Sequence, residues 1–150
     1  MQHIDTKHIN IGKVHPDSYK QLLALSTQAE GALAVAGLSP LLAELVKIRV
    51  SQINGCAFCL RAHSRDAVAK GESADRLAVL AAWWESQYFS PVEEAALQIA
   101  EDTTQLTAAT KRRELAGLLS PDQVSAITWL AIVMNAWNRV AIQSHYPVSA

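Results

Sequence analysis

The sequence predicts an all-α protein, a helical bundle of about six to seven helices, and three observations lead to this fold class. First, an N-cap serine followed by proline at the first helical position occurs three times, at Ser39-Pro40, Ser90-Pro91 and Ser120-Pro121. Second, apolar residues repeat at helical spacing between these pairs. Third, no alternating apolar and polar pattern of useful length indicates a β-strand.

Two of the predicted helices meet at Gly55. The first begins at Pro40, and its apolar stripe consists of Leu42, Leu45, Val46, Val50 and Ile53. Glycine commonly follows the last residue of a helix because it adopts a positive φ without strain. We therefore expect Gly55 to end this helix and Gly71 to end the next one.

Ser73 can cap a further helix, whose apolar residues are Leu77, Leu80 and Ala81. Two of the serine–proline pairs also complete a capping box, because Glu93 and Gln123 lie three residues after their serines. These signals predict helix starts near residues 74, 91 and 121.

The last predicted helix runs from Pro121 towards Tyr146 and is apolar on most sides. Its apolar residues include Ile127, Leu130, Ala131, Val133 and Met134. Such a helix needs cover on several faces, and another subunit could provide part of that cover.

Composition limits the class of protein. A chain of 150 residues is long enough for a single domain over residues 1–150 with a real core, and residues 1–16 are expected to form a loosely held N-terminal arm. The formal net charge of -1 gives no electrostatic reason to expect a nucleic acid or an anionic membrane as partner. Without a membrane-spanning apolar run or a secretory signal pattern at residues 1–5, the expected location is the cytoplasm.

Cys56 and Cys59 are the two cysteines of the chain. A bond between residues three apart closes a very small loop and stabilises a fold little, so a scaffolding disulfide is not expected. In a reducing compartment such a pair is more often redox-active or metal-binding. A redox pair, half of a zinc site and two inert buried thiols all remain open from the spacing alone.

His63 shares a predicted helix face with both cysteines, because residues 56, 59 and 63 follow i, i+3, i+7 spacing. Cys56 is expected at or next to the N-terminus of this helix, directly after Gly55. Unpaired backbone N–H groups and the helix dipole favour a thiolate there, and a neighbouring imidazole favours it further. An ordinary thiol has a pKa of about 8.5, so these effects would raise its reactivity at neutral pH.

Glu44 lies on the helix before Gly55, roughly 16 Å along the helix from that break at 1.5 Å per residue. If the next helix returns antiparallel, Glu44 comes closer to His63 than to Cys56. Glu44 would then orient His63, and His63 would exchange protons with a cysteine. A lone glutamate is more commonly a solvated surface residue, and that alternative stays open.

Together Glu44, Cys56, Cys59 and His63 match the signature E-x11-C-x-x-C-x3-H. The chain thereby resembles the AhpD-like proteins, the alkylhydroperoxidase members of the carboxymuconolactone decarboxylase superfamily. The resemblance is strong over residues 41–71 and looser through Trp83-Trp84, residues 89–94 and residues 135–139.

The resemblance implies an all-helical protein that forms a homo-oligomer, dimer to hexamer, and reduces hydroperoxides without a cofactor or metal. By this resemblance Cys59 attacks the peroxide and Cys56 then condenses with it, while Glu44 and His63 form a proton relay. The reductant would be a protein dithiol, lipoyl-bearing or thioredoxin-like. The position of Cys56 at the helix end argues instead that Cys56 is the more acidic thiol, so the order of attack stays open.

Phe58 departs from the family pattern, because the best-studied peroxidase branch has histidine immediately before the second cysteine. One proton carrier is lost and the pocket should be drier, which leaves thiol–disulfide exchange as an alternative to peroxide reduction. The cysteine pair itself counts against the decarboxylase reaction. The remaining alternative is a metal-binding or redox-sensing module with Cys56, Cys59, His63 and Glu44 as ligands.

Other residues carry weaker hypotheses. The four tryptophans, Trp83, Trp84, Trp129 and Trp137, could wall a pocket, although tryptophans at helical spacing more often lie in a core or a subunit interface. Asn138 and Arg139 are a possible polar contact near the site, and residues 111–113 form a basic run expected on a solvated helix face.

Overall fold

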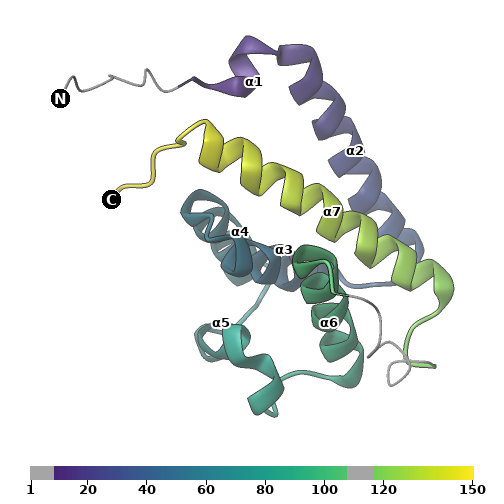
Figure 1. The fold of residues 1–150 in the computed structure, drawn as a ribbon. Helices are drawn as coiled ribbons and strands as arrows, with labels where there is room; N and C mark the ends of the chain where they lie inside the picture. The colour runs from purple at the N-terminus through teal and green to yellow at the C-terminus, as the bar shows by residue number, and fades with distance from the viewer. Residues whose placement is uncertain (1–8, 108–116) are drawn as a thin grey trace.

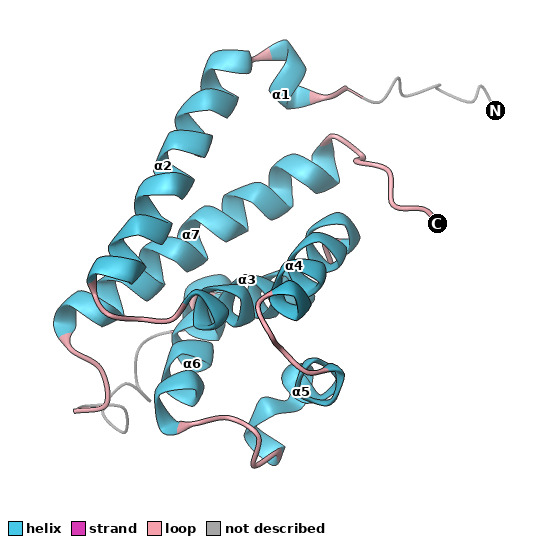
Figure 2. Ribbon diagram, turned by 180° about the vertical axis from the view of Figure 1, so that it is seen from behind, coloured by secondary structure: helices cyan, strands magenta, loops and turns pink. Residues whose placement is uncertain are grey.

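The computed structural model describes residues 9–107 and 117–150, and every regular element in them is helical (Figures 1 and 2). The all-α prediction is confirmed. In chain order the elements are α1 (Ile11–Val14), α2 (Pro16–Val35), α3 (Pro40–Asn54), α4 (Ala57–Ala69), α5 (Ala74–Val79), the 3₁₀ helix η1 (Leu80–Glu85), α6 (Pro91–Gln105) and α7 (Pro121–Gln143).

The predicted helix starts are confirmed by their hydrogen bonds. Ser39, Ser73, Ser90 and Ser120 each accept a hydrogen bond from the backbone amide three residues on. At α6 and α7 the side chain of the third helical residue also accepts from the serine amide, which completes both capping boxes. Local sequence therefore sets where the main helices begin.

Two predicted helix ends need correction. The helix capped by Ser73 was expected to continue through Ala81, but its α-helical part ends at Val79 and the chain continues as η1, with a non-helical backbone at Ala82. The last helix was expected to approach Tyr146, but α7 ends at Gln143 and His145 has a φ of +50°. Both ends follow from chain turns that the apolar periodicity does not encode.

The N-terminal arm predicted over residues 1–16 falls partly outside the described residues, which begin at residue 9. Asn10 caps the short helix α1, and the Ile11 amide donates to Ser144 Oγ at 3.2 Å. Pro16 opens the long helix α2.

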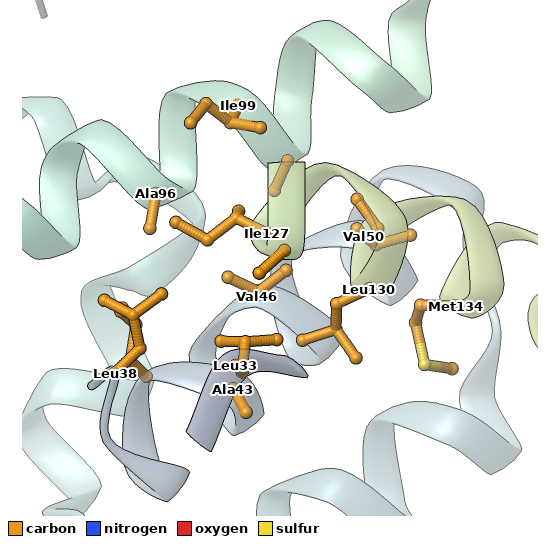
Figure 3. Packing of buried hydrophobic residues seen from close by; sticks show 14 of the residues in the cluster. Leu33, Leu38, Ala43, Val46, Val50, Ala96, Ile99, Ile127, Leu130 and Met134 are labelled. Atoms are coloured by element: carbon orange, nitrogen blue, oxygen red, sulfur yellow. The ribbon is translucent and has the colours of Figure 1, made fainter. Parts of the chain in front are cut away.

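Helix α3 occupies the middle of the molecule. It packs against α4, α6 and α7, while α2 packs along α7 and contacts α3 (Figure 1). The main core joins Leu33 of α2, Val46 of α3, Ile99 of α6 and Leu130 of α7, as Figure 3 shows. The same cluster of buried residues includes Cys56 and Cys59, so the cysteine pair is set into the core and not on the surface.

A second, smaller core lies on the other side of α3, where Leu45 and Ile48 pack with Leu80, Trp83 and Leu97. Because both faces of α3 are covered, every residue from Leu42 to Ser51 is buried, charged ones included. Within the described residues, no helix combines the length and apolar character needed to cross a membrane.

Candidate active site

The candidate site begins at the junction of α3 and α4. Gly55 follows α3 in the left-handed region, at φ 68° and ψ 36°, a conformation that glycine adopts without strain. This turn places Cys56 at the N-cap of α4, where its Sγ accepts a hydrogen bond from the Cys59 amide at 3.3 Å. The predicted position of Cys56 at the helix N-terminus is therefore confirmed.

Cys56 and Cys59 are joined by a disulfide, with their Cα atoms 5.4 Å apart. Both residues are buried, with 1% of Cys56 and 4% of Cys59 exposed. The structure therefore shows the oxidised form of the pair, held at the end of α4 and within the main core.

Glu44 and His63 face each other across the antiparallel pair α3 and α4. Glu44 Oε2 lies 3.1 Å from His63 Nδ1, and Glu44 is only 1% exposed. The expected closeness of Glu44 to His63 is confirmed, and the alternative of a solvated surface glutamate is wrong. On the outer side, Asp66 Oδ2 lies 3.8 Å from the same ring nitrogen.

Two lysines complete the surroundings of the Glu44 carboxylate. Lys70 Nζ lies 2.5 Å from Oε1, and Lys47 Nζ lies 3.3 Å from the same oxygen. Burial by itself raises the pKa of Glu44, but hydrogen bonds from His63 and Lys70 and the charge of Lys47 outweigh it and lower that pKa from 4.5 to about 2. Glu44 is therefore an anion throughout the physiological pH range.

The charge state of Glu44 fixes the hydrogen bond to His63. An ionised carboxylate has only acceptor oxygens, so His63 Nδ1 must donate. In neutral His63 the proton then sits on Nδ1, and Nε2 is the nitrogen left to accept a proton.

A cavity of about 310 Å³ opens beside the disulfide, between α2, α4 and α7. Cys59 and His63 both line it, whereas Cys56 and Glu44 are not among its lining residues. Most of the wall is apolar or aromatic: Tyr19, Leu23, Phe58, Ala62, Leu130, Val133, Met134, Trp137, Ala141 and Tyr146. A small apolar molecule in this cavity would therefore lie in a space that Cys59 and His63 both line.

Similarity to known proteins identifies the family of this chain. Residues 16–102 match the profile of the carboxymuconolactone decarboxylase family, which is more than half of the chain. The chain belongs to this family. A relative in Bacillus subtilis (strain 168), the uncharacterized protein YdfG, is 40% identical over 103 residues, which cover 66% of this chain and 70% of YdfG.

A solved structure relates the chain to the AhpD-like members of the family. It is a protein of unknown function from Agrobacterium tumefaciens, provisionally assigned as the antioxidant defence protein AhpD. The two structures superpose with a TM-score of 0.83 at 27% identity, over 95% of this chain and 98% of the other. The resemblance read from the cysteine motif is thus confirmed at the level of fold and family.

All four residues of the AhpD-like motif come together in the structure, with Cys56, Cys59 and His63 on α4 or its N-cap and Glu44 on α3. The four tryptophans lie in three different surroundings. Trp137 lines the cavity, but Trp83 belongs to the second core, and Trp84 and Trp129 are exposed.

Asn138 is fully buried and donates to Ser51 Oγ at 3.0 Å, so this hydrogen bond links α7 to α3. Arg139 donates to the Asn135 carbonyl within α7. The basic run at 111–113 lies outside the described residues.

Residues Lys47, Lys70 and Glu30 were not predicted for the site. Lys47 is only 7% exposed and forms ion pairs with Glu44 and with Glu30 of α2. One signal for Lys47 was available, because it follows Glu44 by three residues and such pairs meet on one helix face. Lys70 and Glu30 gave no such signal, since only the packing of α2 and α4 onto α3 brings them there.

Two of the four ligands that the metal-binding alternative requires, Glu44 and His63, lie close enough together to share a metal ion with Asp66. Glu44, His63 and Asp66 offer ligand atoms within 4.8 Å of one another. However, Oε1 of Glu44 already meets two ammonium groups, and their positive charges oppose a cation at that position. The bonded sulfurs of Cys56 and Cys59 also cannot act as thiolate ligands in this state.

Proposed function

We propose that this protein is a thiol-dependent peroxidase that reduces organic hydroperoxides through a dithiol–disulfide cycle of Cys56 and Cys59. The observation that carries the proposal is that Cys59, bonded to Cys56, shares one apolar cavity with His63, whose other side is held by Glu44. Membership of the AhpD-like group supports the same reaction class.

Cys59 is the cysteine that attacks in this proposal, because it lines the cavity and Cys56 does not. This choice agrees with the family resemblance. Cys56, at the N-cap, has the stronger contact with the helix dipole, and this favours its thiolate as the partner that resolves the intermediate.

The reaction proceeds in two chemical steps. The Cys59 thiolate attacks the terminal oxygen of the hydroperoxide, so that a sulfur–oxygen bond forms and the oxygen–oxygen bond breaks. Cys59 becomes a sulfenic acid, and the departing alkoxide takes a proton to leave as the alcohol. Cys56 then attacks the sulfenic sulfur, which releases water and forms the disulfide seen in the structure.

Proton transfer in this scheme depends on His63. Its Nε2 accepts the thiol proton and returns it to the alkoxide, while Nδ1 stays bonded to Glu44. Glu44 thus orients the ring and stabilises the positive charge that His63 carries between the two transfers.

A dithiol must then reduce the Cys56–Cys59 disulfide to close the cycle. We propose a protein dithiol as the donor, lipoyl-bearing or thioredoxin-like. The donor's thiolate attacks one sulfur and forms a mixed disulfide, and its second thiol then releases the reduced pair together with the oxidised donor.

Mass spectrometry after one equivalent of cumene hydroperoxide tests the proposal. The reduced wild-type protein should lose two hydrogens, and the Cys56→Ser variant should instead gain one oxygen at Cys59. The matched variant Cys59→Ser should gain no oxygen at Cys56. Unmodified cysteines in the wild type after a slight excess of peroxide would exclude the reaction.

Phe58 favours a second candidate, general thiol–disulfide exchange. Its ring lines the cavity and packs edge-on against Tyr146 with the ring centroids 5.0 Å apart, so an apolar group stands beside the cysteines. Turnover of cumene hydroperoxide and of a small disulfide with the same dithiol donor separates the two candidates. Faster turnover of the disulfide would favour the second.

A further inference from the structure

We propose that Lys47 and Lys70 are positioning residues of the site, which together hold the buried Glu44 carboxylate as a fixed anion aimed at His63. This inference deepens the proposed function and rests on it for its catalytic meaning. The geometry that carries it is that the two oxygens of the Glu44 carboxylate contact different partners.

The two oxygens of Glu44 meet different partners. Oε1 lies 2.5 Å from Lys70 Nζ and 3.3 Å from Lys47 Nζ, whereas Oε2 lies 3.1 Å from His63 Nδ1. Two ammonium groups on one oxygen fix the rotation of the carboxylate. Because Oε1 is held in this way, Oε2 is left pointing at the imidazole.

A buried carboxylate needs such partners to remain charged. Transfer of an isolated carboxylate from water into a protein interior favours its protonated form. A protonated Glu44 could donate to His63 Nδ1, and the imidazole would then have its proton on Nε2, where it could no longer accept one from a thiol. The lysines therefore keep Glu44 ionised, so that Nε2 of His63 stays able to accept a proton.

Lys47 is itself buried and has a compensating partner. Glu30 of α2 forms an ion pair with Lys47 at the edge of the same cavity. The charges therefore alternate from Glu30 to Lys47 to Glu44. Glu44 also contacts Lys70 and His63, and Asp66 lies 3.8 Å from the His63 ring. Tyr19 and Tyr146 are further titratable groups that line this cavity.

In this arrangement His63, and not Glu44, gains and loses the proton during the proposed cycle. A carboxylate that already neutralises two ammonium groups is a poor proton acceptor, so Glu44 does not pass through a protonated state during the cycle. Its contribution is to fix the tautomer and orientation of His63.

The decisive experiment follows the ¹³Cδ signal of Glu44 against pH in the oxidised protein, without any peroxide. Lys70→Met and Lys47→Met should each move the midpoint upward by roughly one pH unit, the effect of losing a nearby opposite charge. The double variant should move the midpoint further than either single change, because both ammonium groups near Glu44 Oε1 are then lost.

Two controls separate positioning from a general structural role. Lys70→Arg keeps the charge and should retain the wild-type midpoint, and Lys20→Met removes an exposed lysine of α2 and should also leave it unchanged. A wild-type midpoint in both Lys70→Met and the double variant would overturn the inference. Because no peroxide is used, this result is independent of whether the protein reduces hydroperoxides.

Discussion

His63 connects the cavity to the buried charges. One ring nitrogen contacts Glu44, and His63 lines the same cavity as Cys59, so the proposed proton transfer from the thiol would leave the contact with Glu44 in place. At the residue scale, the consequences of this position and of the charge on Glu44 can both be tested by substitution.

Replacement of His63 by glutamine should slow oxidation of the reduced protein by cumene hydroperoxide by roughly 10²-fold, because general base catalysis contributes at least that factor. Stopped-flow fluorescence at neutral pH measures the rate. His15→Gln changes an exposed histidine far from the motif in sequence and serves as the control. Equal rates for both variants and the wild type would remove His63 from the relay.

Glu44 should make the stability of the fold depend on pH. Its pKa is lowered in the folded protein from 4.5 to about 2, so its contribution is fully present above about pH 4.5 and is lost as the pH falls towards 2. The loss amounts to about 3 kcal/mol. Urea unfolding of the wild type and Glu44→Gln from pH 6 to pH 2.5 measures it.

The glutamine variant should be less stable than the wild type at pH 6, since it leaves the buried Lys47 with one carboxylate fewer. The stability difference between the two proteins should shrink steadily below pH 4.5. A constant difference across the range would show that Glu44 is not a buried anion.

Helix α3 shows how an element can depart from its apparent amphipathic pattern. The apolar stripe of residues 42–53 suggested one buried face, but two cores cover opposite sides of the helix and also bury Glu44, Lys47 and Arg49. Each of these charged residues has an ion-pair partner, as Arg49 has in Glu101 of α6. The buried charges on α3 therefore form pairs that the pattern of one helix cannot reveal.

The junction of α3 and α4 depends on one glycine. Gly55→Ala puts a Cβ into the left-handed region at φ 68° and should cost about 1–2 kcal/mol of unfolding free energy. Gly31→Ala is the matched control, because Gly31 lies inside α2 with open space at its Cβ position and should gain roughly 0.5–1 kcal/mol. Thermal unfolding of both variants should show opposite shifts of Tm.

The Gly55→Ala change should also disturb the chemistry, because Gly55 sets Cys56 at the N-cap. We expect slower disulfide formation when the reduced variant is oxidised by cumene hydroperoxide, measured by mass spectrometry of quenched samples. Wild-type stability and wild-type disulfide formation together would contradict this account of the turn.

On the scale of the whole molecule, α7 presents apolar side chains on two sides. Its inner side fills the main core, and on its outer side Trp129 and Ile132 are 49% and 41% exposed. Single exposed apolar residues are ordinary, whereas exposed apolar side chains that form one patch can mark an association surface, and Trp129 and Ile132 lie three residues apart on one face of α7. We propose that this side of α7 mediates homo-oligomer formation.

Analytical ultracentrifugation of Trp129→Lys tests that proposal. A charge in an apolar contact should weaken association, so the variant should sediment as a smaller species than the wild type. Lys20→Met, on the exposed side of α2, should leave the oligomeric state unchanged. A monomeric wild type would contradict the proposal directly.

The sequence alone predicted the all-α class, the serine caps of four helices, the break at Gly55 and the four motif residues. The caps, the glycine break and the shared face of Cys56, Cys59 and His63 could be predicted because each depends on residues close together in the chain: a cap, a left-handed glycine, or i, i+3, i+7 spacing. Glu44 lies 19 residues from His63 and was assigned through the resemblance to AhpD-like proteins. The helix after Ser73 and α7 both end earlier than expected, since the apolar periodicity does not encode the change to η1 or the positive φ at His145.

Tertiary structure decided the environment of the site. Three features depend on how α2, α4 and α7 pack on α3: the burial of Glu44, the convergence of Lys47 and Lys70 on one oxygen, and a cavity lined by Cys59 but not by Cys56. Glu44 and Lys70 are 26 positions apart in the chain, and the residues that line the cavity extend from Tyr19 to Tyr146. A linear sequence records which groups are present, but the charge state of a carboxylate depends on the distances and solvent exclusion that folding creates.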